Sequence, residues 1–91
     1  MAYEVRYTPI ANMGLANLEK NEPKAFAKAL RLLEEIQEHP RTGTGHPEQL
    51  SGDLTGKWSR RINKKHRLIY QIHDMEVIVV VISAYGHYSD K

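Results

Sequence analysis

The chain has 91 residues and no cysteine, so we expect one domain over residues 1–91, small enough that its core must form without disulfides. The formal net charge is only +2, and the lack of cysteine is typical of a reducing compartment, which makes the cytoplasm the expected location. The charge is unevenly placed, because residues 57–67 contain six Lys and Arg and no acid.

Several function classes can be excluded at this stage. The longest apolar run, residues 77–82, is too short to cross a membrane, and residues 1–10 lack the apolar segment of a signal peptide. The five histidines include no pair at i, i+4 spacing and have no thiolate beside them. We therefore expect no membrane partner, no metal site and no cofactor.

The first half of the chain predicts a strand followed by two helices. Residues 2–8 alternate in the manner of a strand with one buried face. Thr8 and Pro9 are typical of a helix start, and the break at residues 21–23 ends that helix and begins a second over residues 23–38. The second helix carries an apolar stripe, which we interpret as core and which comprises Phe26, Leu30, Leu33, Ile36 and Gln37 with Ala29 beside them.

The second half predicts a long loop and three strands. Residues 40–53 contain two prolines and three glycines, and irregular segments of this length in small domains are often functional. Residues 57–63 and 66–73 predict a hairpin, and the apolar run within residues 76–84 predicts a central strand covered on both faces. The order β-α-α-β-β-β favours an α+β fold, a mostly antiparallel sheet with two helices packed on one face.

The basic hairpin has two interpretations. Its cations are either a solvated charged turn or a surface for a polyanion such as RNA. On the second interpretation, the RNA-binding candidates are Lys57, Arg60, Arg61, Lys64 and Lys65. Lys24 and Lys28 lie on the second predicted helix, so we expect charge reversal there to have little effect on binding.

A carboxylate, an arginine and a histidine are enough for metal-free RNA cleavage. The carboxylate removes the 2′-hydroxyl proton, the guanidinium stabilises the charge that develops on the phosphate, and the histidine protonates the leaving oxygen. Glu48, Arg67 and His87 could supply these groups. Taken singly, each has a plainer explanation as a solvated acid, a cross-sheet ion pair or a polar tail residue, so spacing alone does not decide.

Three sequence patterns carry a resemblance that bears on this choice. They are G-x-G-x-P-E-x-L at residues 43–50, L-x-G-x-W-S-R-R-I-x-x-x-H-R-L-I-Y beginning at Leu54, and G-H-Y at residues 86–88. Together they resemble the YoeB/Txe toxins of the RelE superfamily. The resemblance implies a RelE-like microbial ribonuclease fold and ribosome-dependent cleavage of messenger RNA in the ribosomal A site. The implied partners are mRNA, the ribosome, a second copy in a homodimer, and an antitoxin whose acidic segment folds on binding.

The same resemblance implies residue roles. Glu48 matches the family's general base, Arg67 its transition-state arginine and His87 its general acid. Tyr88 matches the aromatic residue that shapes the site, and Arg61 a basic residue that contacts phosphate. His66 lies within the matched string but at the hairpin turn, so we interpret it as structural. The sequence departs from the family pattern at two places. Ser51 stands where some members have lysine, and residues 89–91 follow Tyr88.

Two other functions remain open. One is a non-catalytic module that binds RNA or the ribosome through the same basic surface, and the other is an inactive partner that represses transcription together with its antitoxin. The joint presence of Glu48, Arg67 and His87 favours the enzyme, because a pure binder needs the cations but neither the base nor the acid.

Overall fold

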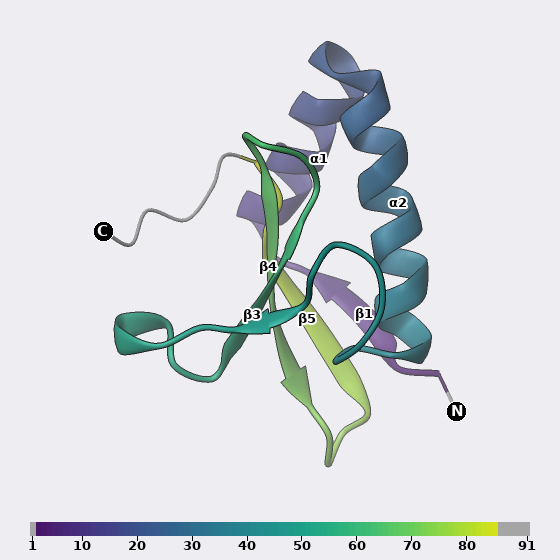
Figure 1. The fold of residues 1–91 in the computed structure, drawn as a ribbon. Helices are drawn as coiled ribbons and strands as arrows, with labels where there is room; N and C mark the ends of the chain where they lie inside the picture. Colours follow the sequence, from purple (N-terminus) through teal and green to yellow (C-terminus); the bar gives the residue numbers. More distant parts are fainter. Residues whose placement is uncertain (1, 86–91) are drawn as a thin grey trace.

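The structure, a computed structural model, describes residues 2–85 and has an α+β architecture (Figure 1). The helices are α1 (Pro9–Asn21) and α2 (Pro23–Glu38), with a short 3-10 helix η1 (Gly52–Leu54). The strands are β1 (Glu4–Tyr7), β2 (Glu48–Gln49), β3 (Lys57–Arg61), β4 (Arg67–His73) and β5 (Ile78–Ser83). They form one sheet in the order β1-β5-β4-β3-β2, in which only the β1–β5 pair of the described residues is parallel. The predicted fold class is confirmed.

The helix boundaries follow from local chemistry. Thr8 accepts a hydrogen bond from the Ala11 amide at 3.0 Å, which caps α1, and Pro9 occupies the first turn, where its missing N–H costs nothing. Thr8 also donates to the Ile82 carbonyl at 2.6 Å, which ties the start of α1 to β5. Pro23 begins α2 at the predicted residue.

The buried face of α2 differs from the predicted stripe. It consists of Ala25, Ala29, Leu32, Leu33 and Ile36, at the four- and three-residue steps of a helix packed on a sheet. Leu30 is 44% exposed and Gln37 is exposed, so their assignment to the core was wrong. The buried stripe of α2 is therefore displaced by about one residue toward the N-terminus from the stripe that the sequence predicted.

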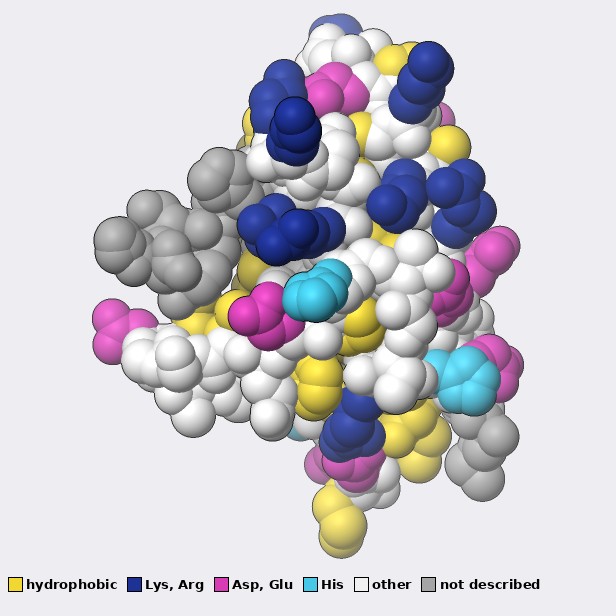
Figure 2. Space-filling view, in the orientation of Figure 1, with side chains coloured by type: hydrophobic (Ala, Val, Ile, Leu, Met, Phe, Trp, Pro, Cys, Tyr) yellow, Lys and Arg dark blue, Asp and Glu magenta, His cyan; other side chains and the backbone are white. Residues whose placement is uncertain are grey.

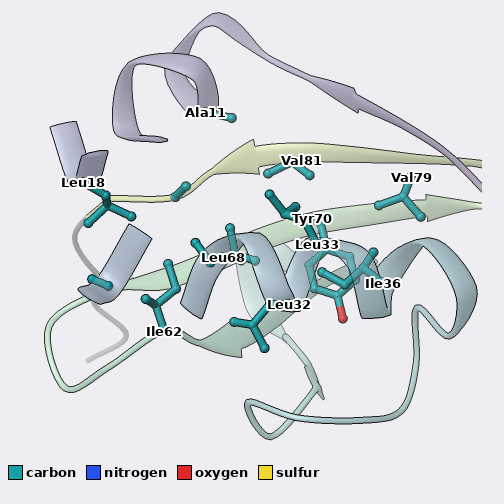
Figure 3. Close-up of a cluster of buried hydrophobic side chains, with 13 residues drawn as sticks. Ala11, Leu18, Leu32, Leu33, Ile36, Ile62, Leu68, Tyr70, Val79 and Val81 are labelled. Carbon is teal, nitrogen blue, oxygen red and sulfur yellow. The ribbon is translucent and has the colours of Figure 1, made fainter. Parts of the chain in front are cut away.

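The core lies between the two helices and the covered face of the sheet (Figure 3). Leu18 of α1 and Leu32 and Ile36 of α2 are fully buried there. They pack in one cluster with side chains of the sheet, namely Ile62, Leu68, Tyr70, Val79 and Val81. Among residues 2–85, neither α1 nor α2 packs on the other face of the sheet.

Strand β5 is central, as predicted, because it lies between β1 and β4. Val79 and Val81 are fully buried, whereas Ile78, Val80 and Ile82 are only partly buried. The expectation that both faces of this strand are covered is therefore only partly met, since both helices pack on the same face. Within residues 2–85, neither helix is long and apolar enough to span a membrane.

Candidate active site

The strand register places three predicted site residues on the face of the sheet that carries no helix. Glu48 of β2 pairs with Ser59 of β3, and Arg61, two residues further along β3, pairs with Arg67 of β4. Paired residues in an antiparallel sheet share a face, and so do residues two apart in one strand. Glu48, Arg61 and Arg67 are therefore neighbours on this open face.

Arg61 and Arg67 form a like-charge pair directly opposite each other on adjacent strands. Such a pair destabilises an isolated sheet unless an anion compensates it. The Nη1 atom of Arg67 is buried and makes no hydrogen bond within the described part of the chain. A guanidinium nitrogen in this state carries a desolvation cost that a bound phosphate oxygen would remove.

Glu48 is held at the sheet edge by the short strand β2, which the sequence analysis had placed within a loop. Its side chain is exposed and takes no part in the ion pairs among residues 2–85. The chain reaches β2 through His46, which has a φ of 59°, a conformation uncommon for a residue with a side chain. The Arg61 amide donates to the Gly45 carbonyl at 2.6 Å, which fastens this approach to β3.

Arg60 organises the loop that precedes β2 and does not face solvent. It is fully buried, and its guanidinium donates to the carbonyl oxygens of His39, Thr42 and Thr44 at 2.6, 2.8 and 3.2 Å. It also donates to Glu35 and to the Tyr70 hydroxyl, each at 3.1 Å. The assignment of Arg60 to RNA contact is therefore corrected, because its side chain lies on the helix-covered face and its donors are used inside the fold.

Glu35 and Tyr70 complete this network. Hydrogen bonds from Thr44, whose amide lies 2.7 Å from Glu35 Oε1, hold the pKa of Glu35 below its ordinary value, and the charge of Arg60 acts in the same direction. The Tyr70 hydroxyl donates to the Pro40 carbonyl at 2.7 Å, and burial raises the pKa of this phenol. The network thus joins α2, the loop and two strands just before Glu48.

The remaining predicted residues fall in different places. Lys57 lies on the open face opposite Gln71, and Lys64 and Lys65 are exposed at the hairpin turn. His87 and Tyr88 lie outside the described residues.

His66, interpreted from the sequence as a structural residue, is buried. Its Nε2 lies 2.8 Å from Glu22 Oε2, and its ring stacks on Tyr85 with centroids 4.6 Å apart. These contacts join the hairpin turn to the start of α2 and to Tyr85, two residues after the end of β5.

Lys28, at which charge reversal was expected from the sequence to have little effect on binding, lines a pocket together with Arg61, Lys64 and Arg67. Figure 2 shows Lys and Arg side chains gathered over the β3–β4 hairpin and the facing part of α2. Only the packing of α2 beside the hairpin brings Lys28 to this position, so no sequence pattern could have indicated it. Among residues 2–85, no group of three or more potential ligands is placed to hold a metal ion.

A family model of YoeB-like toxins of bacterial type II toxin–antitoxin systems matches residues 8–88 of this sequence. The chain belongs to this toxin family. It is 46% identical over 65 residues to a toxin YoeB of Mycobacterium bovis, covering 71% of this chain and 74% of that protein. It is 40% identical over 70 residues to a toxin YoeB of a Synechocystis species, covering 77% and 79%.

Solved structures of YoeB toxins share the fold. A YoeB/ParE toxin from Agrobacterium tumefaciens superposes with a TM-score of 0.87 and 28% identity, covering 93% of this chain and 99% of that one. The YoeB dimer of Staphylococcus aureus gives a TM-score of 0.83 with 32% identity, covering 97% and 100%. The toxin in the heterotetrameric YoeB–YefM toxin–antitoxin complex of the same species gives 0.81 with the same identity and coverage.

Proposed function

We propose that this YoeB-family toxin is an endoribonuclease that cleaves mRNA in the ribosomal A site and needs no metal. The observation that best supports the proposal is the Arg61–Arg67 pair. The two residues lie opposite each other on neighbouring strands, and the Arg67 Nη1 atom is buried with no hydrogen bond to any of residues 2–85. This arrangement is unfavourable alone and becomes favourable when a phosphate group lies between or above the two guanidinium groups.

The proposed reaction uses one base, one cation and one acid. Glu48, exposed on the same face as Arg67, removes the proton from the 2′-hydroxyl, whose oxygen then attacks the adjacent phosphorus. The Arg67 guanidinium stabilises the negative charge of the five-coordinate phosphate. His87, assigned by family resemblance, protonates the departing 5′-oxygen. The P–O5′ bond breaks, leaving a 2′,3′-cyclic phosphate and a 5′-hydroxyl.

Primer extension on an mRNA under translation tests the proposal. The wild-type toxin should create new 5′ ends inside codons, and Glu48→Ala, Arg67→Ala and His87→Gln should each lower cleavage by about a hundredfold or more. Glu34→Ala and Arg31→Ala are matched controls, because both residues are exposed on α2 away from the open face, and both variants should cleave normally.

Ribosome binding separates the enzyme from the non-catalytic alternatives. Glu48→Ala and His87→Gln should bind ribosomes nearly as well as the wild type, whereas Arg67→Ala should bind more weakly because it loses a phosphate contact. Wild-type cleavage by both Glu48→Ala and His87→Gln would refute the acid–base assignment. Ribosome binding by the wild type with no cleavage would favour a binding module instead.

We also propose that a cognate antitoxin neutralises this toxin, as in the YoeB–YefM complex of Staphylococcus aureus. Its acidic segment would fold against the basic open face and oppose the same cations that RNA requires. Homodimer formation is proposed on the basis of the Staphylococcus aureus YoeB dimer. Size-exclusion chromatography with light scattering, with and without antitoxin, measures both assemblies.

A further inference from the structure

A basic pocket lies between α2 and the β3–β4 hairpin. It has a volume of about 410 Å³ and is lined by Lys28 of α2 and by Arg61, Ile62, Asn63, Lys64 and Arg67 of the hairpin. Four of these six side chains are cationic and none is acidic. The pocket therefore concentrates positive charge contributed by two elements that are far apart in the sequence.

Among the residues that the structure describes, no acidic side chain forms an ion pair with these cations. The ion pairs formed among residues 2–85 involve none of Lys28, Arg61, Lys64 and Arg67. By contrast, Arg60 pairs with Glu35, and Lys65 at the same hairpin turn lies 3.9 Å from Glu22. Four close cations repel one another at low ionic strength, so an anion entering the pocket gains from all of them.

The pocket shares Arg61 and Arg67 with the candidate active site. A strand of RNA whose scissile phosphate contacts Arg67 carries further phosphates in both directions. We propose that the pocket binds a phosphodiester group of the substrate next to the scissile one, with the Lys28 ammonium as its contact from α2. This inference rests on the proposed ribonuclease function and adds a subsite to it.

The lining favours a nucleic-acid phosphate over an acidic peptide. A peptide segment that folds on binding needs apolar anchors to offset its ordering cost. Among the described residues that line the pocket, Ile62 is the only apolar one, and it is 2% exposed and packed in the core. A phosphate needs only donors and positive charge, which lysine and arginine side chains provide.

Binding of non-cleavable RNA tests the subsite. Affinity for a fluorescent hexanucleotide with 2′-O-methyl groups throughout would be measured by anisotropy over a range of salt concentrations. Lys28→Gln should weaken binding roughly 3- to 10-fold at low salt. It should also lower the steepness of log K against log salt concentration by the equivalent of about one phosphate contact. Lys24→Gln is the matched control, since Lys24 is exposed one turn earlier on α2 and outside the pocket, and it should change affinity less than about twofold.

Two further measurements separate a phosphate contact from a general effect of charge: the dependence of binding on RNA length, and the affinity of the conservative variant Lys28→Arg. A dinucleoside monophosphate has one phosphate, which Arg67 would bind, so Lys28→Gln should not affect its binding. Lys28→Arg should keep most of the hexanucleotide affinity, and thermal melting would confirm that all variants are folded. In cleavage of a short RNA, Lys28→Gln should raise KM and leave kcat nearly unchanged, because the subsite does not touch the reacting atoms.

Four results would overturn the inference. The first is failure of the wild type to bind the hexanucleotide at low salt, and the second is an equal loss of affinity for Lys28→Gln and Lys24→Gln. The third is that Lys28→Gln weakens binding only to mRNA-free ribosomes, and the fourth is that it weakens binding only to the antitoxin. The third result would assign the phosphate to ribosomal RNA, and the fourth would assign the pocket to an acidic peptide. Because the hexanucleotide is not cleaved, a toxin that binds as expected yet never cleaves mRNA would refute the proposed function and not the subsite.

Discussion

Arg60 and Arg61 are consecutive residues of β3, and their side chains lie on opposite faces of the sheet. Arg60 is fully buried among the carbonyl oxygens of the loop before β2, whereas Arg61 is exposed opposite Arg67. We predict that Arg60→Ala lowers the free energy of unfolding by about 3 kcal/mol or more, because it leaves buried carbonyl groups and the Tyr70 hydroxyl without their donor.

Arg61→Ala is the matched control for that prediction. It should change stability by less than about 0.5 kcal/mol, because it removes an exposed side chain that faces a like charge, yet it should weaken RNA binding. Urea denaturation and RNA anisotropy on both variants give the comparison. Equal stability losses at the two positions would contradict the different roles assigned to them.

Gly45 tests how tightly the approach to Glu48 is constrained. It has a φ of +86°, and an added Cβ would lie 3.0 Å from both the Arg61 carbonyl oxygen and Leu32 Cδ2. Gly45→Ala should therefore destabilise the fold by about 2 kcal/mol or more through strain plus crowding. Gly52→Ala, at a φ of +65° with nothing within 4 Å of the added Cβ, should cost only the strain, about 1 kcal/mol. A larger loss for Gly52→Ala in chemical denaturation would contradict this account.

Glu35 should contribute to acid sensitivity. Thr44 and Arg60 lower its pKa in the folded state, so its stabilising contribution is fully present above the ordinary carboxyl pKa and is lost as the pH falls through the lowered value. In Glu35→Gln the free energy of unfolding should be lower near neutral pH and fall less steeply toward about pH 3. Glu34→Gln, an exposed neighbour outside the ion pairs of residues 2–85, should retain the wild-type slope.

Cleavage should survive removal of divalent metal ions. If Glu48 and His87 move the protons and Arg67 carries the charge stabilisation, no step requires a Lewis acid. A short RNA at high toxin concentration would be incubated with excess EDTA, which avoids the dependence of ribosomes on Mg²⁺. Loss of activity in EDTA that is restored by Zn²⁺ would contradict this prediction and would indicate that histidines of this chain bind a metal ion.

Arg60 was assigned to RNA contact because of the number of cations in the hairpin. The alternation of inward and outward side chains along the strand could have indicated its buried position. Arg60 stands two residues from both Trp58 and Ile62, which pack in or against the core, so period-two alternation indicates an inward side chain. The hairpin cations share a composition but not an orientation, so composition alone placed Arg60 on the wrong face. A buried guanidinium is tolerated here because loop carbonyls far away in the sequence supply its acceptors, and no local pattern reports them.

The sequence by itself determined the order of the two helices and of every strand except β2, the bounds of α2, and the patterns that indicated the toxin family. These follow from capping residues, hydrophobic periodicity and a long motif, which are local properties of the chain. Only the tertiary structure decided that Glu48 forms part of a strand, that Arg60 faces inward and that Lys28 joins the hairpin cations. Strand pairing and helix packing bring together residues tens of positions apart, and the register of that packing depends on the whole core.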